Sequence, residues 1–158
     1  MKKKNSITTI FMIVNVLFLI GCATPPRPEP TYITNSEVVN KPFDVVWTQL
    51  IEYLSSRQIQ LKTINKESGF LDTEFMLLPA QILPNYAWTG SNLPSMLHNK
   101  GRIKANIFVK KISASQNSVT INAWVQVFEV YIGKYSPGGW LNAKSTGRFE
   151  SDVLNILR

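Results

Sequence analysis

The runs RIKANIFVKKI, residues 102–112, and VTINAWVQVFEVYI, residues 119–132, are separated by a short turn over residues 113–118. Apolar and polar residues alternate along both runs, and successive side chains of a β-strand point to opposite faces of a sheet. The two runs therefore predict a β-hairpin with one buried face. The face expected to point away from the core carries Arg102, Lys104, Asn106, Phe108, Thr120, Asn122, Trp124, Gln126 and Phe128.

This outer face has the composition of a protein-binding surface. Aromatic side chains and arginine are enriched where proteins bind one another. If helices cover only the other side of the sheet, the aromatic rings contact solvent or a partner. A β-bulge that reversed the two faces would instead place these rings in the core. The binding candidates on the hairpin are Arg102, Lys104, Phe108, Trp124 and Phe128, and Tyr135 and Trp140 in the predicted loop 133–142 could join them.

Two helices are predicted, one on each side of these strands in the chain. Residues 40–57 place apolar side chains at helical spacing, and Pro42 suits the first turn of a helix. Residues 145–158 repeat this pattern, with Ser145 or Thr146 as the capping residue. Each helix has one apolar stripe, so each must pack that stripe against another element.

The remaining pattern predicts further strands. Residues 59–65 and 70–78 alternate in polarity around the turn sequence KESG, which is typical of a hairpin. Residues 37–39 could form a short edge strand. The predicted order is β-α-β-β-β-β-α over a single domain, residues 32–158. The fold class expected is a two-layer α+β domain, in which two helices lie on one face of a curved antiparallel sheet of four or five strands.

Residues 79–101 are a long connection for which the pattern predicts no helix or strand. Loops of this length in compact domains are commonly functional or disordered, and aromatic content argues against disorder. Tyr86 and Trp88 in this loop are therefore further binding candidates. The alternative is that the loop folds back and covers one end of the sheet.

The amino-terminal residues have the pattern of an export signal. Three lysines at positions 2–4 precede a mostly apolar run over residues 7–20. This run is shorter than the roughly 20 apolar residues that cross a bilayer, and it fits the apolar region of a signal peptide. Residues 1–21 are therefore predicted to be removed and take no part in the fold.

The sequence LIGC at residues 19–22 resembles the lipobox of bacterial lipoproteins. The resemblance implies cleavage between Gly21 and Cys22 and lipidation of the Cys22 thiol. Two or more acyl chains hold a protein stably on a membrane, at about 0.8 kcal/mol per buried methylene. Residues 22–31 include four prolines and predict a semi-rigid tether. Ala23 is not the aspartate associated with inner-membrane retention, so the resemblance implies the outer membrane, with the domain on its periplasmic face.

The charge balance argues against a nucleic-acid partner. The formal net charge is +7, but three of the 17 lysines and arginines lie in residues 1–21, which leaves an excess of +4. This excess is modest, and an exported protein does not meet nucleic acid in its compartment.

The folded part resembles the helix-grip domains of BamC-type outer-membrane assembly lipoproteins. The resemblance rests on the helix start PFDVVW, residues 42–47, on the turn KESGFL, residues 66–71, and on the order of elements from residue 38 to 158. The resemblance implies a non-enzymatic, protein-binding or accessory module of the cell envelope. The chain has room for one such domain, whereas the best-known members have two.

The sequence predicts no enzyme, no metal and no cofactor. His98 is the only histidine and is expected in an exposed loop without a second ligand nearby. No set of nucleophile, base and orienting group is recognisable. Asp72 and Glu74 could share one strand face as paired carboxylates, but two acids on a hairpin are usually solvated.

Two further functions are alternatives to protein binding. A carrier of a lipid or small hydrophobic ligand would hold its ligand in a cavity between sheet and helix, with Phe43, Trp47 and Phe75 as lining. A contact with peptidoglycan would use Lys104, Lys110 and Lys111.

Overall fold

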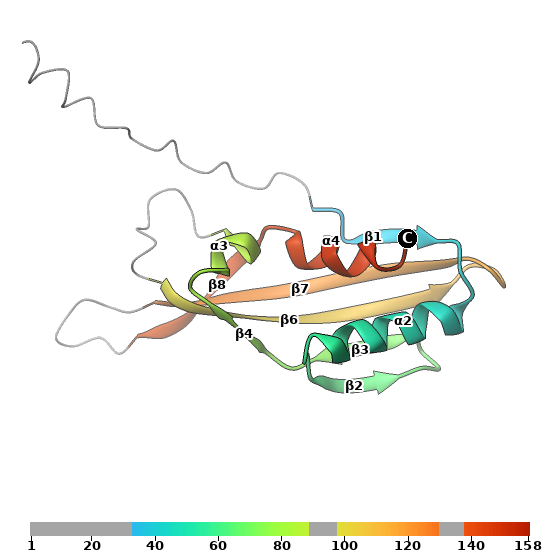
Figure 1. The fold of residues 1–158 in the computed structure, drawn as a ribbon, viewed down its shortest axis with the longest axis horizontal. Helices are drawn as coiled ribbons and strands as arrows, with labels where there is room; N and C mark the ends of the chain where they lie inside the picture. The colour runs from blue at the N-terminus through green and yellow to red at the C-terminus, as the bar shows by residue number, and fades with distance from the viewer. Residues whose placement is uncertain (1–32, 89–97, 130–137) are drawn as a thin grey trace, which may run out of the picture.

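The computed structural model describes residues 33–88, 98–129 and 138–158. Within these ranges the chain forms eight strands and three helices. The elements, shown in Figure 1, are β1 (Ser36–Val39), α2 (Phe43–Ser56), β2 (Leu61–Asn65), β3 (Phe70–Thr73), β4 (Met76–Pro79), α3 (Leu83–Tyr86), β5 (Ala87–Trp88), β6 (His98–Lys111), β7 (Asn117–Glu129), β8 (Gly139–Ser145) and α4 (Arg148–Asn155).

The hairpin of β6 and β7 is the centre of the sheet. These two strands pair antiparallel along almost their whole length, from Gly101 opposite Val127 to Lys111 opposite Asn117. Strands β3 and β4 pair with one edge of β6, and β1 and β8 pair with the outer edge of β7. The hairpin predicted from the alternation is therefore confirmed, and the other strands are arranged around it (Figure 1).

The α+β class with two layers is also confirmed, but the prediction of four or five strands is wrong. The run predicted as one strand over residues 70–78 is divided into β3 and β4 at Glu74 and Phe75. Strand β3 pairs with residues 106–108 of β6, and β4 pairs with residues 100–103. The short break between them lets the chain follow the twist of its long partner strand. The other added strands are β5, which lies in the predicted connection 79–101, and β8, which begins in the predicted loop 133–142 and ends at Ser145, where the second helix was predicted to start.

The first predicted helix is confirmed as α2, which starts at Phe43. Pro42 precedes it, and the Pro42 carbonyl accepts hydrogen bonds from the amides of Val45 and Val46 at 3.1 Å each. Proline suits this place because it has no amide hydrogen of its own to satisfy. The buried stripe of α2 consists of Phe43, Val46, Trp47, Leu50 and Leu54.

Helix α4 begins later than predicted. Its N-cap is Gly147, with φ of 80°, and neither Ser145 nor Thr146 holds that position. A side chain on Gly147 would approach Ile33 to 2.9 Å, so glycine also permits the chain around residue 33 to pack closely. Ser145 still contributes, because its hydroxyl accepts from the Gly147 amide at 3.0 Å and donates to Glu150 at 3.1 Å.

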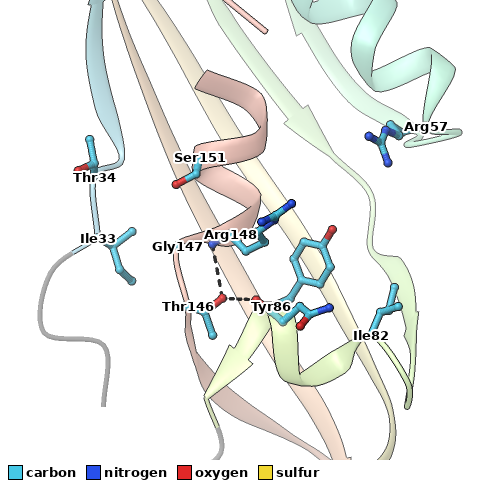
Figure 2. A pocket seen from close by; sticks show the side chains of 10 residues that line it. Ile33, Thr34, Arg57, Ile82, Tyr86, Thr146, Gly147, Arg148 and Ser151 are labelled. Carbon is cyan, nitrogen blue, oxygen red and sulfur yellow. Dashed lines mark hydrogen bonds between the residues drawn. The ribbon is translucent and has the colours of Figure 1, made fainter. Parts of the chain in front are cut away.

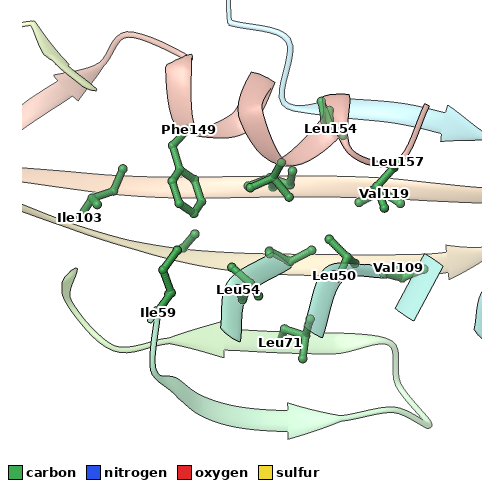
Figure 3. Close-up of a cluster of buried hydrophobic side chains, with 14 of the residues drawn as sticks. Leu50, Leu54, Ile59, Leu71, Ile103, Val109, Val119, Phe149, Leu154 and Leu157 are labelled. Atoms are coloured by element: carbon green, nitrogen blue, oxygen red, sulfur yellow. The ribbon is translucent and has the colours of Figure 1, made fainter. Parts of the chain in front are cut away.

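Helices α2 and α4 cover the same face of the sheet, as predicted. Leu50 and Leu54 of α2 and Leu154 of α4 are at most 2% exposed and belong to one core with the buried face of β6 and β7 (Figure 3). Ile107 and Ile121 on that face are fully buried. The opposite face of the sheet carries no helix among the described residues. Within the described ranges, no helix is long and apolar enough to cross a bilayer.

Candidate binding face of the sheet

The face of the sheet that points away from α2 and α4 carries the predicted binding residues of the hairpin. Alternation places Ile103 and Val125 in the core, so their neighbours point the other way. Trp124 is 45% exposed and Phe108 is 42% exposed on this helix-free face. The alternative in which a bulge turns these rings into the core is therefore wrong.

Three basic side chains follow one another at alternate positions of β6 and contact aromatic rings. The Lys100 ammonium lies 4.5 Å from the centre of the Phe128 ring and 5.8 Å from that of Trp140. The Arg102 guanidinium lies 4.2 Å from the ring centres of both Phe75 and Trp140. Each distance is within the range of a cation–π contact.

Lys104 completes the series. Its ammonium lies 5.4 Å from the ring centre of Phe75 and 5.5 Å from that of Trp124. The basic side chains thus alternate with aromatic rings that come from the β3–β4 break on one side and from β7 and β8 on the other. We call this group the cation–aromatic row: Lys100, Arg102, Lys104, Phe75, Trp124, Phe128 and Trp140.

Polar contacts hold the centre of the row in place. The Arg102 Nε donates to Gln126 Oε1 at 2.7 Å, and Gln126 Nε2 donates to Asn142 Oδ1 at 2.9 Å. The rings of Phe128 and Trp140 meet edge to face, with centres 5.2 Å apart. Because these contacts bridge β6, β7 and β8, the guanidinium is fixed between the rings rather than free to sample rotamers.

The row carries three positively charged side chains. Among the described residues, neither Lys100, Arg102 nor Lys104 forms an ion pair with a carboxylate. Asp72 on β3 pairs in register with Asn106 of β6, and one of its carboxylate oxygens is buried without a hydrogen-bond partner. The face can therefore offer both apolar ring surface and unpaired positive charge, which suits a partner that presents acidic side chains.

Four of the predicted binding residues are brought together in the row: Arg102, Lys104, Trp124 and Phe128. Phe108 lies nearer the other end of β6, where its ring is 4.9 Å from that of Phe70. The prediction missed Lys100, although extending the alternation back from Arg102 by two residues would have found it. It also placed Trp140 in a loop, whereas Trp140 lies on β8 opposite Phe128.

The other two predicted binding residues do not join the row. Trp88 lies on β5, opposite Lys144 of β8. Tyr86 instead lines a separate cavity of about 800 Å³, together with Arg57, Arg148 and Ser151 (Figure 2). Both cationic groups of this cavity have other contacts, since Arg148 pairs with Asp152 at 3.0 Å and Arg57 lies over the Tyr53 ring.

The ligand-carrier alternative predicted a common lining that does not form. Phe43 and Trp47 are 8% and 6% exposed, and their rings stack 5.7 Å apart within the core. Phe75 belongs to the opposite face, where Arg102 covers its ring. The three aromatic side chains therefore do not line one cavity between sheet and helix.

Several other predicted residues are also placed by the fold. His98 is the first residue of β6 and pairs in register with Glu129, so the prediction that it lies in a loop is wrong. Asp72 and Glu74 do not share a strand, because Glu74 lies in the break after β3. In the described part of the chain, no cluster of three or more His, Cys, Asp or Glu residues could hold a metal ion.

The lysines proposed for a peptidoglycan contact do not form one patch. Lys111 lies 4.5 Å from the ring centre of Phe43, on the side of the helices, whereas Lys104 belongs to the helix-free face. Gly21 and Cys22 lie outside the described residues, as do the rest of the signal segment, the tether over residues 22–31 and Tyr135.

No family model matches the chain, and no curated protein matches its sequence.

Proposed function

We propose that the chain is an outer-membrane-anchored lipoprotein whose domain is a non-enzymatic, protein-binding or accessory module of the cell envelope. The anchoring part of the proposal is supported by the basic start, the apolar run and the sequence LIGC that ends at Cys22. The observation that carries the binding part is the cation–aromatic row on the helix-free face. The lipid-anchored domain would face the periplasm and present this face to another envelope protein.

A protein partner fits the row better than a small ligand does. The row lies along one strand of an open sheet, so it offers an extended surface rather than an enclosed site. Its aromatic rings and its arginine are the residue types that contribute most to binding between proteins. Each exposed cation–π contact contributes only about 0.5–1 kcal/mol, so the rings mainly orient the positive charges for a partner with acidic side chains.

We further propose that the domain is a single helix-grip unit similar to those of BamC-type lipoproteins. The support is the long helix α2, which packs on the core face of the sheet that α4 also covers and starts with the PFDVVW sequence. Because fold alone does not establish function, the binding proposal rests on the row and not on this similarity.

Site-specific photocrosslinking in living cells tests the binding proposal. A photoreactive phenylalanine analogue at position 124 samples the helix-free face, and the same analogue at Ser55, an exposed position on α2, is the matched control. We expect a discrete crosslinked protein from position 124 and none from position 55. The combined change Arg102→Ala and Lys104→Ala should lower the yield at position 124 at least fivefold.

The proposal is contradicted if both positions crosslink to the same proteins with the same yield, or if removal of the two charges leaves the yield at position 124 unchanged. Levels of the variant proteins, measured by immunoblot, show whether a lost crosslink reflects a lost protein.

A further inference from the structure

The outer edge of β7 contains a gap between its two neighbouring strands. β1 pairs with residues 117–120 of β7, and β8 pairs with residues 125–129. Asn122, Ala123 and Trp124 lie between these two stretches, and within the described ranges the only strand they pair with is β6, on the inner side. In the described part of the chain, the outer edge of β7 is thus not paired with a strand over these three residues.

The backbone of Ala123 points into this gap. The Ile121 amide donates outward to the Asn35 carbonyl at 2.7 Å, and peptide directions alternate along a strand, so Ala123 has the same orientation as Ile121. Strand β6 supports this orientation of Ala123. The amide of Ala105, the residue opposite Ala123, donates away from β7 to the Thr73 hydroxyl at 2.9 Å. The Ala123 amide and carbonyl are therefore directed at whatever occupies the gap.

A buried carboxylate lies next to the gap. Glu150, in the first turn of α4, is 3% exposed. It accepts a hydrogen bond from the Ser145 hydroxyl at 3.1 Å. No lysine or arginine of the described residues forms an ion pair with it. Burial raises the pKa of Glu150 above its ordinary value, while its own amide and Ser145 oppose that rise.

The gap and the carboxylate share one cavity. This cavity has a volume of about 420 Å³, and its lining includes Asn35, Ala123, Trp124, Ser145 and Glu150. Its apolar lining consists of Ile33, Ile121 and the half-exposed Trp124, and the Asn35 amide donates to the Asn122 side chain at 3.2 Å within the same lining. A cavity of this size accommodates the end of one long side chain or a small organic cation.

We propose that this cavity binds a guanidinium or alkylammonium group. A buried carboxylate without a cation is costly, and a ligand that brings a positive charge and N–H donors removes that cost. In the proposed site Glu150 supplies the negative charge, the Ala123 carbonyl accepts a further hydrogen bond, and Trp124 packs against the apolar stem of the ligand. Glu150 gives this site the opposite sign of charge to the cation–aromatic row, which suits anionic groups. Trp124 belongs to both, and the Lys104 ammonium lies 5.5 Å from the centre of its ring, so the variants that test the site change Glu150 and leave Trp124 unaltered.

Titration of the full-length protein in detergent micelles with small ligands tests this inference. The probe is N-acetyl-arginine methylamide at pH 7.5, and the matched control is the citrulline derivative, which has the same shape but no charge. We expect saturable binding of the arginine derivative, with shifts of the amide NMR signals of Ala123 and Ser145, and at least tenfold weaker binding of the citrulline derivative. Equal binding of the two, or no shift near Ala123, would overturn the inference.

Two variants separate the site from nonspecific attraction of cations. Glu150→Gln keeps the shape of the side chain and should weaken binding of the arginine derivative at least tenfold, whereas Glu52→Gln, at an exposed position on α2, should leave it within twofold. Unchanged affinity of Glu150→Gln would refute the site. If that variant does not fold, the comparison of arginine with citrulline in the unaltered protein decides.

A second titration distinguishes the two sources of such a group. Putrescine represents a free polyamine, and the arginine derivative represents a side chain of a protein. Tighter binding of the arginine derivative supports a protein side chain as the natural ligand, and tighter binding of putrescine supports a small cation. If neither binds, the inference is wrong.

Discussion

At the scale of single residues, Gly69 shows how closely the first hairpin approaches the centre of the sheet. Its φ of 69° lies in the left-handed region, and a Cβ atom there would be 2.0 Å from the Val109 carbonyl oxygen. The Gly69 carbonyl also accepts a hydrogen bond from the Val109 amide at 2.8 Å. The turn after β2 is thus joined directly to β6, and only a residue without a side chain fits.

We therefore expect Gly69→Ala to lower the free energy of unfolding by about 2 kcal/mol or more, since left-handed backbone alone costs roughly 1–2 kcal/mol for a residue with a Cβ. Gly139→Ala is the matched control, because a Cβ at Gly139 has no atom within 4 Å and that position is not in the left-handed region. Urea denaturation of both variants measures the difference. Similar midpoints for the two variants would contradict the expected role of Gly69.

A second prediction at the residue scale concerns Glu150, because its buried carboxyl makes the stability of the fold depend on pH. Burial raises the pKa of Glu150 above 4.5, so the folded protein holds this proton more tightly than the unfolded chain does. The stability due to the protonated carboxyl is full below the unfolded pKa and is lost as the pH rises from about 4.5 through the folded pKa.

Glu150→Gln should therefore flatten the dependence of the urea midpoint on pH above 4.5. Asp44 does not contribute to the pH dependence in this range. Lys66 lowers the pKa of Asp44 from 3.8, so the stability that the ionised Asp44 carboxylate provides is lost only at lower pH. The same pH slope in both proteins would show that Glu150 is not the group responsible.

At the scale of elements, helix α2 joins the two layers through a small number of fully buried side chains. Leu50 has no exposed surface and belongs to the core that α2 shares with the sheet (Figure 3). Helix propensity contributes little compared with this burial, since a helix of this length is marginal in isolation.

Leu50→Ala should lower the free energy of unfolding by about 2–5 kcal/mol, because it removes buried methyl groups and leaves a cavity. Val45→Ala on the same helix is the control, since Val45 is 43% exposed and its truncation should cost less than about 1 kcal/mol. Guanidinium chloride denaturation followed by circular dichroism compares the two. Equal losses would mean that α2 does not hold the layers together through Leu50.

Long helices and strands could be predicted from the sequence, whereas short ones could not. The long alternating runs of β6 and β7 and the apolar stripe of α2 could be read from the sequence, because side-chain period alone distinguishes a strand from a helix. The two-residue strand β5 and the break at Glu74 could not be read in this way, because such short pieces become strands only through pairing with β8 and β6.

At the scale of the whole molecule, the proposed anchor depends on one thiol. Cys22→Ala should abolish labelling by radioactive palmitate, because the Cys22 thiol is the proposed acceptor of the acyl chains. Labelling followed by immunoprecipitation measures the change. Palmitate labelling that persists in Cys22→Ala would contradict the lipoprotein proposal.

The sequence by itself determined the α+β class, the two principal helices, the central hairpin and the face on which Arg102, Lys104 and Trp124 lie. Each of these follows from the spacing of apolar and polar side chains along a short stretch of the chain. Only the tertiary structure decided which rings stack on which cations, that β1 and β8 leave a gap along β7, and that Glu150 is buried beside it. These features join residues far apart in the chain, and their contacts depend on strand register and packing, which no local pattern encodes.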